Sequence, residues 1–395
     1  MDNDFNTVII TYSKKNDTTT YGGHISSGAG NSDTYTVPKV MYNADEYTFT
    51  VQTVDYNNNK SNGVSVNLNS STTEPEQPTP APNPDNTPKP DFSKYKNQTH
   101  WFYGIKGPLP DDAAWEHPKE ENRVWTLHWK PEYGWYDVNK TSSVDSDYQL
   151  EKAKDDNLCW AATASNILHW WFRVNADYIR RYDELHPDKA KKRPSSDYPK
   201  VGTVHMGGSQ FQESEIFQYF INHFVDEGGW GDDGFNWFVS GTVPTMPAMT
   251  QDSGGGFFSD VFPKGKHLAT NKQGLSKDIF TETIIDVIEN HKALGLTSLS
   301  GRTHLMSVWG AEFDDEGYVK AIYLADNNAL QSTKPYDKQL TRRLIRYKQF
   351  EGYNATYTEM SAFGTDSYSQ ISSVVIVDLG TKYWDDYFKN IENNK

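Results

Sequence analysis

The sequence contains a single cysteine, Cys159, among its 395 residues. One cysteine excludes an internal disulfide framework, because each disulfide joins two cysteines. A lone thiol in a chain of this size has two interpretations, a small buried apolar side chain or a reactive nucleophile. The residues around Cys159 therefore have to decide between a structural and a chemical role.

Long apolar runs and clusters of basic residues are also missing. Apolar stretches such as 167–172 are interrupted by polar residues and fall short of the roughly 18 apolar residues of a membrane-spanning helix. The net charge is −15, and no block of Lys and Arg offers a surface for nucleic acid. Residues 1–4 lack the basic and apolar regions of a signal peptide. We therefore expect neither a membrane-spanning segment nor a nucleic-acid partner.

Metal-binding motifs are absent from the sequence, which has no His-Glu-x-x-His pattern and no cysteine cluster. The acidic stretch 314–317 is too short for a calcium-binding loop and is typical of a turn between strands. We therefore expect no metal ion and no organic cofactor.

The first part of the chain, 1–70, predicts strands separated by turns rich in Gly, Asn, Asp and Ser. The predicted strands are 8–12, 47–55 and 63–68. Residues 47–61 resemble the last hairpin of a fibronectin type III domain, although 1–70 is too short for the roughly seven strands of that sandwich. We therefore predict a small, incomplete all-β sandwich, a partial fibronectin type III-like module.

A proline-rich segment, 71–95, follows this module. It has almost no apolar residue to bury, so we expect a semi-rigid, extended linker rather than a folded element.

The remaining residues, 96–395, predict one α+β domain, because helical patterns come first and strands of an antiparallel sheet come later. Apolar spacing predicts helices at 159–186, 213–225 and 279–291. Apolar runs predict strands at 305–313, 318–325 and 371–377. The first two of these strands flank the turn at 314–317 and should form a hairpin.

Cys159 begins the longest predicted helix. Asp and Asn residues at 155–157 precede it and are typical of a helix cap. A helix N-terminus favours an anion and lowers the pKa of a thiol. Small residues at 161–164 leave room for backbone amides near an oxyanion. By position alone, Cys159 can still be either a nucleophile or a core residue.

A nucleophilic thiol needs a base, and His304 is the best placed of the histidines. His169 lies on the same predicted helix, about 15 Å further along, and cannot reach the thiol. His304 begins a predicted strand and follows Cys159 at the separation of about 130–150 residues found in papain-like enzymes. A hydrogen-bonded structural histidine remains the alternative.

The imidazole in turn needs an acceptor for its second nitrogen. Asp326 ends the second strand of the predicted hairpin. A turn at 314–317 would place Asp326 directly opposite His304, where its carboxylate could hold the ring in one tautomer. A polar residue that simply ends a strand is the alternative.

Several ordered blocks between 96 and 380 resemble the streptococcal immunoglobulin-degrading cysteine endopeptidases, the IdeS family. The resembling blocks are 135–141, 155–172, 254–262, 292–296 and 304–326. The resemblance implies a papain-like cysteine peptidase domain with Cys159 as nucleophile, His304 as base and Asp326 as orienting carboxylate. It also implies that Lys140 stabilises the oxyanion, where a cation lowers the barrier by several kcal/mol.

The chain departs from this family at two positions. The family has a second acidic residue two positions after its aspartate, where this chain has Asn328. Asn328 keeps the ability to hydrogen-bond, so we expect it to support Asp326 less strongly. The family commonly has glycine after the nucleophile, where this chain has Trp160, whose indole is expected to narrow the cleft.

The resemblance implies a secreted or bacterial cell-surface endopeptidase that cleaves immunoglobulin heavy chains near the hinge through an acyl-enzyme. Three alternatives stay open: a peptidase for other proteins or peptides, a non-catalytic immunoglobulin-binding protein, and transglutamination by the same residues. The aromatic stretch 229–238 predicts either a substrate-binding exosite or part of the core. The sequence does not specify the oligomeric state.

Overall fold

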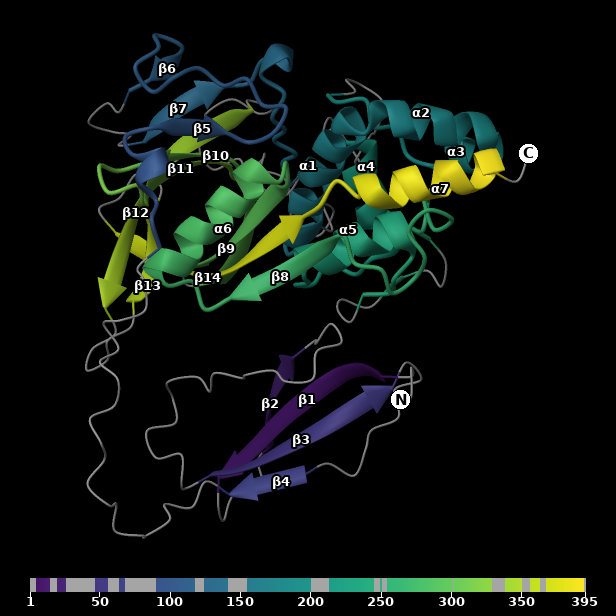
Figure 1. The fold of residues 1–395 in the computed structure, drawn as a ribbon, viewed down its shortest axis with the longest axis horizontal. Coiled ribbons are helices and arrows are strands. Elements are labelled where there is room, and N and C mark those ends of the chain that lie inside the picture. The colour runs from purple at the N-terminus through teal and green to yellow at the C-terminus, as the bar shows by residue number, and fades with distance from the viewer. Residues whose placement is uncertain are drawn as a thin grey trace. The chain divides into compact units, whose positions relative to one another are not determined.

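The computed structural model divides the chain into two compact units, Met1–Pro88 and Lys89–Lys395 (Figure 1). The described residues are 5–14, 20–25, 47–55, 64–67, 90–117, 124–140, 155–199, 213–244, 249–250, 254–300, 302–328, 338–349, 356–362 and 367–393.

The first unit contains a four-stranded antiparallel sheet in the order β2-β1-β3-β4. Its strands are β1 (Phe5–Lys14), β2 (Thr20–Ile25), β3 (Tyr47–Asp55) and β4 (Val64–Asn67). The three predicted strands are confirmed, and β2 is an addition that the glycines in its sequence conceal. The described strands form one sheet and not the two facing sheets of a sandwich, so the fibronectin-like module stays a prediction.

Most of the predicted linker, 71–95, lies outside the described residues. Its last part contains a short 3-10 helix, Ser93–Tyr95, and belongs to the second unit. Phe92 and Tyr95 are buried there, in edge or tilted contact with Tyr318 and Phe313 respectively.

The second unit is built on a closed antiparallel barrel. Strands pair in the order β11-β10-β9-β14-β13-β12, and β11 pairs again with β12, which closes the ring of six strands. These strands are β9 (Ala293–Ser300), β10 (Arg302–Phe313), β11 (Val319–Ala325), β12 (Gln339–Gln349), β13 (Thr356–Ser361) and β14 (Tyr368–Val377). Four more strands extend it: β5 (Thr99–Trp101) on β10, β6 (Trp115–Glu116) and β7 (Trp125–His128) beyond β12, and β8 (Ala269–Gln273) on β14.

The predicted papain-like fold is therefore wrong, because the closure of β11 onto β12 makes this a barrel-based domain. Local apolar spacing predicts where strands lie but not how distant strands pair. The sequence pattern also conceals β12 itself, since Arg342, Arg343 and Arg346 interrupt its apolar residues.

Seven helices accompany the barrel in the described part of the second unit. They are α1 (Cys159–Val174), α2 (Ala176–Leu185), α3 (Pro187–Lys192), α4 (Glu215–His223), α5 (Gly231–Ser240), α6 (Lys277–Glu289) and α7 (Thr381–Asn393). Most of them gather at one side of the barrel, whereas α6 lies across its strands (Figure 1). None of these described helices has the length and apolar content to cross a membrane.

The predicted helices at 213–225 and 279–291 are confirmed as α4 and α6. The predicted helix 159–186 is instead two helices, α1 and α2, separated at Asn175. The buried Asn175 side chain donates a 3.3 Å hydrogen bond to the Leu379 carbonyl, and this contact holds the break in place.

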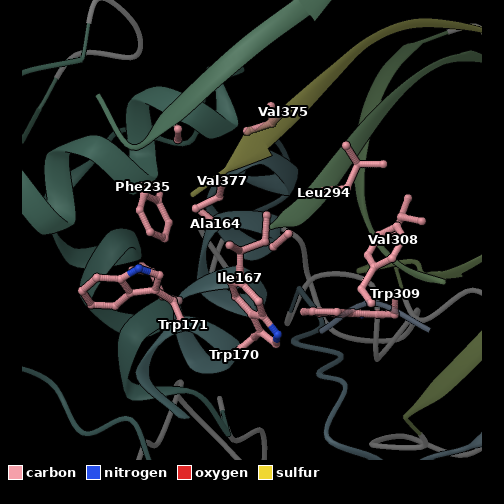
Figure 2. Close-up of a cluster of buried hydrophobic side chains, with 14 of the residues drawn as sticks. Ala164, Ile167, Trp170, Trp171, Phe235, Leu294, Val308, Trp309, Val375 and Val377 are labelled. Atoms are coloured by element: carbon pink, nitrogen blue, oxygen red, sulfur yellow. The ribbon is translucent and has the colours of Figure 1, made fainter. Parts of the chain in front are cut away.

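Helix α1 is the central element of the second unit. Every residue from Trp160 to Phe172 is buried. Figure 2 shows Ile167 of α1 with Phe235 of α5 on one side and Leu294 and Val308 of the barrel on the other. A helix buried on all sides is held rigidly, so the position of its first residue is well defined.

Candidate active site

Cys159 is the first residue of α1, at the end where helix amides have no intrahelical acceptor and the helix dipole is positive. The predicted side-chain cap is wrong, because the N-cap residue is Leu158 and makes no side-chain cap hydrogen bond. Asn157 instead binds Asp226, through its N–H to Oδ1 (2.6 Å) and its Nδ2 to the carbonyl oxygen (3.2 Å). These bonds attach the loop before Cys159 to the segment after α4.

His304 and Asp326 come together at the barrel edge that faces α1. His304 lies in β10, and Asp326 directly follows β11. The imidazole Nε2 is 2.7 Å from Oδ1 of Asp326, and the two side chains are only 15% and 12% exposed. The two residues are not directly opposite, as the predicted hairpin register had it, because the ladder ends with Ser307 paired to Ala325.

The thiol of Cys159 lies close enough to the imidazole of His304 for each group to shift the pKa of the other. Since Asp326 engages Nε2, Nδ1 is the ring nitrogen left for the sulfur. The structure thus brings the three predicted residues together, with the imidazole hydrogen-bonded to the carboxylate and near the thiol.

The electrostatic surroundings of Cys159, His304 and Asp326 favour the ionised form of each side chain. Burial raises the pKa of the Cys159 thiol, but hydrogen bonding to His304 and the positive charge of that ring outweigh it and hold the pKa below the ordinary 9.0. The backbone amide of Leu305 and the charge of Lys140 act in the same direction. A lowered thiol pKa increases the population of thiolate, which is the nucleophilic form.

The pKa values of His304 and Asp326 are also shifted towards the ionised forms. Burial lowers the pKa of His304, but the charge and hydrogen bond of Asp326, followed by Cys159, raise it to about 9. Burial raises the pKa of Asp326, but His304, the charge of Arg343 and the amide of Asn328 lower it to about 2. The three shifts together favour the ionised forms, with thiolate, imidazolium and carboxylate side by side.

Lys140 also lies at this site. Its side chain is buried, and its Nζ donates a 2.5 Å hydrogen bond to the carbonyl of Asp156, in the loop before Cys159. The segment that carries it is fixed to α1, because Val138 N–H donates to Oδ1 of Asn166 at 2.6 Å. Its ammonium is close enough to the sulfur to lower the thiol pKa, although that contribution is the smallest of those named.

The predicted supporting residue Asn328 contacts Asp326 through its backbone. Its N–H lies 3.1 Å from Oδ1 of Asp326. Any residue other than proline can make this bond, so the contact does not depend on the amide side chain that the sequence comparison singled out.

A neighbouring residue, Asn327, is one that sequence reasoning missed. It is fully buried, and its Nδ2 lies 2.8 Å from the carbonyl of Leu305 and 3.2 Å from both the carbonyl of Cys159 and Oγ1 of Thr163. The only local signal was its place directly after Asp326. Its partners are far away in the sequence, so no spacing rule would have identified it.

Trp160 does not narrow a cleft, contrary to expectation. Its indole is fully buried and meets Phe220 and Phe224 edge-on, at centroid distances of 5.8 and 5.1 Å. Its Nε1 donates a 3.0 Å hydrogen bond to the carbonyl of Glu227. The side chain is part of the core between α1 and α4.

The aromatic stretch 229–238 is divided between core and surface. Phe235, Trp237 and Phe238 are buried, whereas Trp230 is 45% exposed. Among the described residues, no group of acidic, histidine or cysteine side chains is arranged to hold a metal ion.

Fold and site together define a barrel-based domain with a Cys-His-Asp cluster at the N-terminus of its central helix. The chain belongs to the Mac 1 family, because residues 48–384 match the model of that family. It is also similar to a protein named IgM protease from Streptococcus suis (strain P1/7), with 27% identity over 320 residues. The match covers 76% of this chain but only 26% of that protein, so the chain spans about a quarter of its relative's length.

Proposed function

We propose that the second unit is a cysteine endopeptidase domain that cleaves an immunoglobulin heavy chain near the hinge, outside the cell or on its surface. The observation that carries the proposal is that Cys159, His304 and Asp326 lie together, with Nε2 of the imidazole 2.7 Å from the carboxylate and the imidazole near enough to lower the pKa of the thiol. The substrate class is supported by membership of the Mac 1 family and by the name of the IgM protease relative.

The first half of the proposed reaction forms an acyl-enzyme. The Cys159 proton moves to His304, and the thiolate attacks the carbonyl carbon of the scissile peptide. As the sulfur–carbon bond forms, the carbonyl electrons move to oxygen, where the Cys159 amide and the charge of Lys140 stabilise them. The carbon–nitrogen bond then breaks as His304 gives its proton to the departing amine.

The second half releases the acyl group. His304, now neutral, accepts a proton from water as the water oxygen attacks the thioester carbon. The sulfur–carbon bond breaks, the new carboxyl product leaves, and the thiolate is restored beside the imidazolium. Throughout, the Asp326 carboxylate keeps the ring oriented and stabilises its positive charge.

Purified immunoglobulins of each class, incubated with the full chain or with Cys159→Ala, test this proposal. We expect discrete heavy-chain fragments from the wild type and none from the variant. Iodoacetamide should abolish cleavage selectively, since Cys159 is the sole cysteine.

Each alternative has its own outcome in the same experiment. Every immunoglobulin class left intact by the wild type contradicts the substrate, and cleavage that survives alkylation contradicts the thiol mechanism. Stable binding without fragments indicates a non-catalytic binder. Incorporation of a labelled amine into the substrate in place of hydrolysis indicates transglutamination.

A further inference from the structure

Asn327 occupies the position in the site where four separate segments meet. Its side-chain amide contacts the backbone of Cys159 in α1 and of Leu305 in β10. Its backbone carbonyl accepts a 2.8 Å hydrogen bond from the N–H of Lys140. It also directly follows Asp326 in the chain. Cys159 and Lys140 are thus bonded to Asn327, Asp326 is its neighbour in sequence, and His304 is the neighbour of its partner Leu305.

The amide group suits this position because its Nδ2 carries two hydrogens. Three acceptors share them: the carbonyls of Leu305 (2.8 Å) and Cys159 (3.2 Å), and Oγ1 of Thr163 (3.2 Å). The Thr163 hydroxyl donates to the same Leu305 carbonyl at 3.0 Å. Asn327, Thr163 and Leu305 therefore form a closed network of hydrogen bonds between α1 and β10.

The three residues of this network are buried. Asn327 is 0% exposed, Thr163 1% and Leu305 5%. Hydrogen bonds are stronger in such surroundings, and a buried group that loses its partner is costly. The separation of α1 from β10 at this level is therefore tightly specified.

That separation matters because Cys159 and His304 come from these two elements. The carbonyl that Asn327 holds belongs to Cys159 itself, and the other belongs to the residue after His304. We propose that Asn327 is a positioning residue, which holds the Cys159 thiol and the His304 imidazole at reacting distance without touching substrate. The expected effect of Asn327 on catalysis rests on the proposed function. Its expected effect on the reactivity of the Cys159 thiol does not.

Asn327→Ala removes the bridge, and alkylation of Cys159 by iodoacetamide across a pH series measures the result without any protein substrate. We expect the midpoint of the alkylation profile to move to higher pH. At about pH 6 the rate should fall at least about tenfold, and kcat for immunoglobulin should fall about 10- to 100-fold while KM changes little.

Asn236→Ala is a matched control. Asn236 is also buried, at 1% exposure, and also joins a helix to a strand. Its Nδ2 donates to the Ala269 carbonyl at 2.9 Å, and its Oδ1 accepts from the Leu268 amide at 3.0 Å. This variant should lose thermal stability as Asn327→Ala does, yet keep the alkylation profile and kcat of the wild type.

Asn327→Ser provides a second test, because a hydroxyl retains one donor. We expect its alkylation midpoint to lie between those of the wild type and Asn327→Ala. If Asn327→Ala does not fold, the serine variant is compared with Asn236→Ala in its place. The positioning role is overturned if the variants at position 327 have the same alkylation profile as the control and the wild type.

The two proposals fail in different ways. A wild type that alkylates readily at low pH but cleaves no immunoglobulin refutes the proposed function, and the alkylation profiles of the Asn327 variants still decide the positioning role. A wild type that cleaves, with Asn327 variants that match it in kcat and alkylation, refutes the positioning role alone.

Discussion

His304 and Asp326 are hydrogen-bonded at 2.7 Å although they are not paired in the ladder between their strands. The ladder ends with Ser307 opposite Ala325, so Asp326 lies just beyond it and His304 lies three residues before its last pair. The backbone does not impose the contact. It depends on the two side chains, which makes the carboxylate a sensitive position to change.

Asp326→Asn should retain the shape of the side chain while removing its charge. The pKa of His304 would then lose the contribution that raises it most, and the buried imidazole would be neutral. Without imidazolium the thiolate is less stable, so we expect kcat to fall about 10²- to 10⁴-fold. Steady-state cleavage of immunoglobulin measures kcat, and iodoacetamide alkylation at about pH 6 measures thiolate.

Asp260→Asn is the control for this substitution. Asp260 also has a lowered pKa, and it accepts hydrogen bonds from Lys189 and Tyr182, none of them in the candidate site. It should leave kcat unchanged. An Asp326→Asn enzyme within about twofold of wild type would contradict the orienting role.

The same pair predicts a pH dependence of stability. The pKa of His304 is raised from 6.5 to about 9, so its contribution is fully present below 6.5 and is lost as pH rises through about 9. The pKa of Asp326 is lowered from 3.8 to about 2, so its contribution is fully present above 3.8 and is lost as pH falls through about 2. The pair should therefore stabilise the fold most between pH 3.8 and 6.5, the ordinary pKa values of Asp326 and His304.

Urea unfolding of the wild type and Asp326→Asn across pH checks this. The difference in free energy of unfolding should be greatest between about pH 4 and 6.5 and shrink towards both extremes. A difference that stays constant across the series would show that the pair is not ionised in the folded protein.

Much of the local structure could be predicted from the sequence. The apolar spacing of α4 and α6 and the runs of β10 and β11 are local signals, and the structure confirms them. Cys159, His304 and Asp326 were identifiable because a helix start and a hairpin turn are also local features. The arrangement of the three side chains does not follow from these local features, because Asp326 lies beyond the end of the ladder and α1 packs against β10 through contacts between distant segments.

What could not be predicted depends on contacts between distant segments. The closure of the barrel joins β11 to β12, whose arginines conceal its strand character. Asn327 acquires its role from Thr163 and Leu305, which are remote in sequence. Trp160 follows Cys159 in the chain, but only the buried surroundings of α1 determine that its indole points into the core.

Trp160→Ala should therefore affect stability and not specificity. The indole fills the space between Phe220, Phe224 and Gly234. It lies so close to Gly234 that a Cβ at that position would come within 2.8 Å of the ring. Removing it leaves a cavity and should cost about 3–5 kcal/mol. Urea unfolding measures that loss, and the ratio of kcat/KM for two immunoglobulin classes measures specificity.

Trp230→Ala supplies the comparison, since Trp230 is 45% exposed and its loss should change stability by less than about 1 kcal/mol. A Trp160→Ala protein of normal stability whose preference between immunoglobulin classes has changed would mean that the indole lines the substrate site after all.

Lys140→Met should separate the two roles that the position of Lys140 allows. Its Nζ anchors the carbonyl of Asp156, and its charge lies near the Cys159 sulfur. Alkylation by iodoacetamide develops no oxyanion, whereas peptide cleavage does. If the ammonium stabilises the oxyanion, kcat should fall about 10²- to 10³-fold while the alkylation rate changes only about threefold.

Lys272→Met controls for the loss of a partly buried lysine, because Lys272 donates a 3.0 Å hydrogen bond to Thr283, away from the site. It should leave both rates unchanged. An equal fall in alkylation and cleavage for Lys140→Met would assign Lys140 to holding the loop before Cys159, since misplacing the thiol impairs every reaction of the sulfur alike. A fall in cleavage alone follows only if the charge acts on the oxyanion.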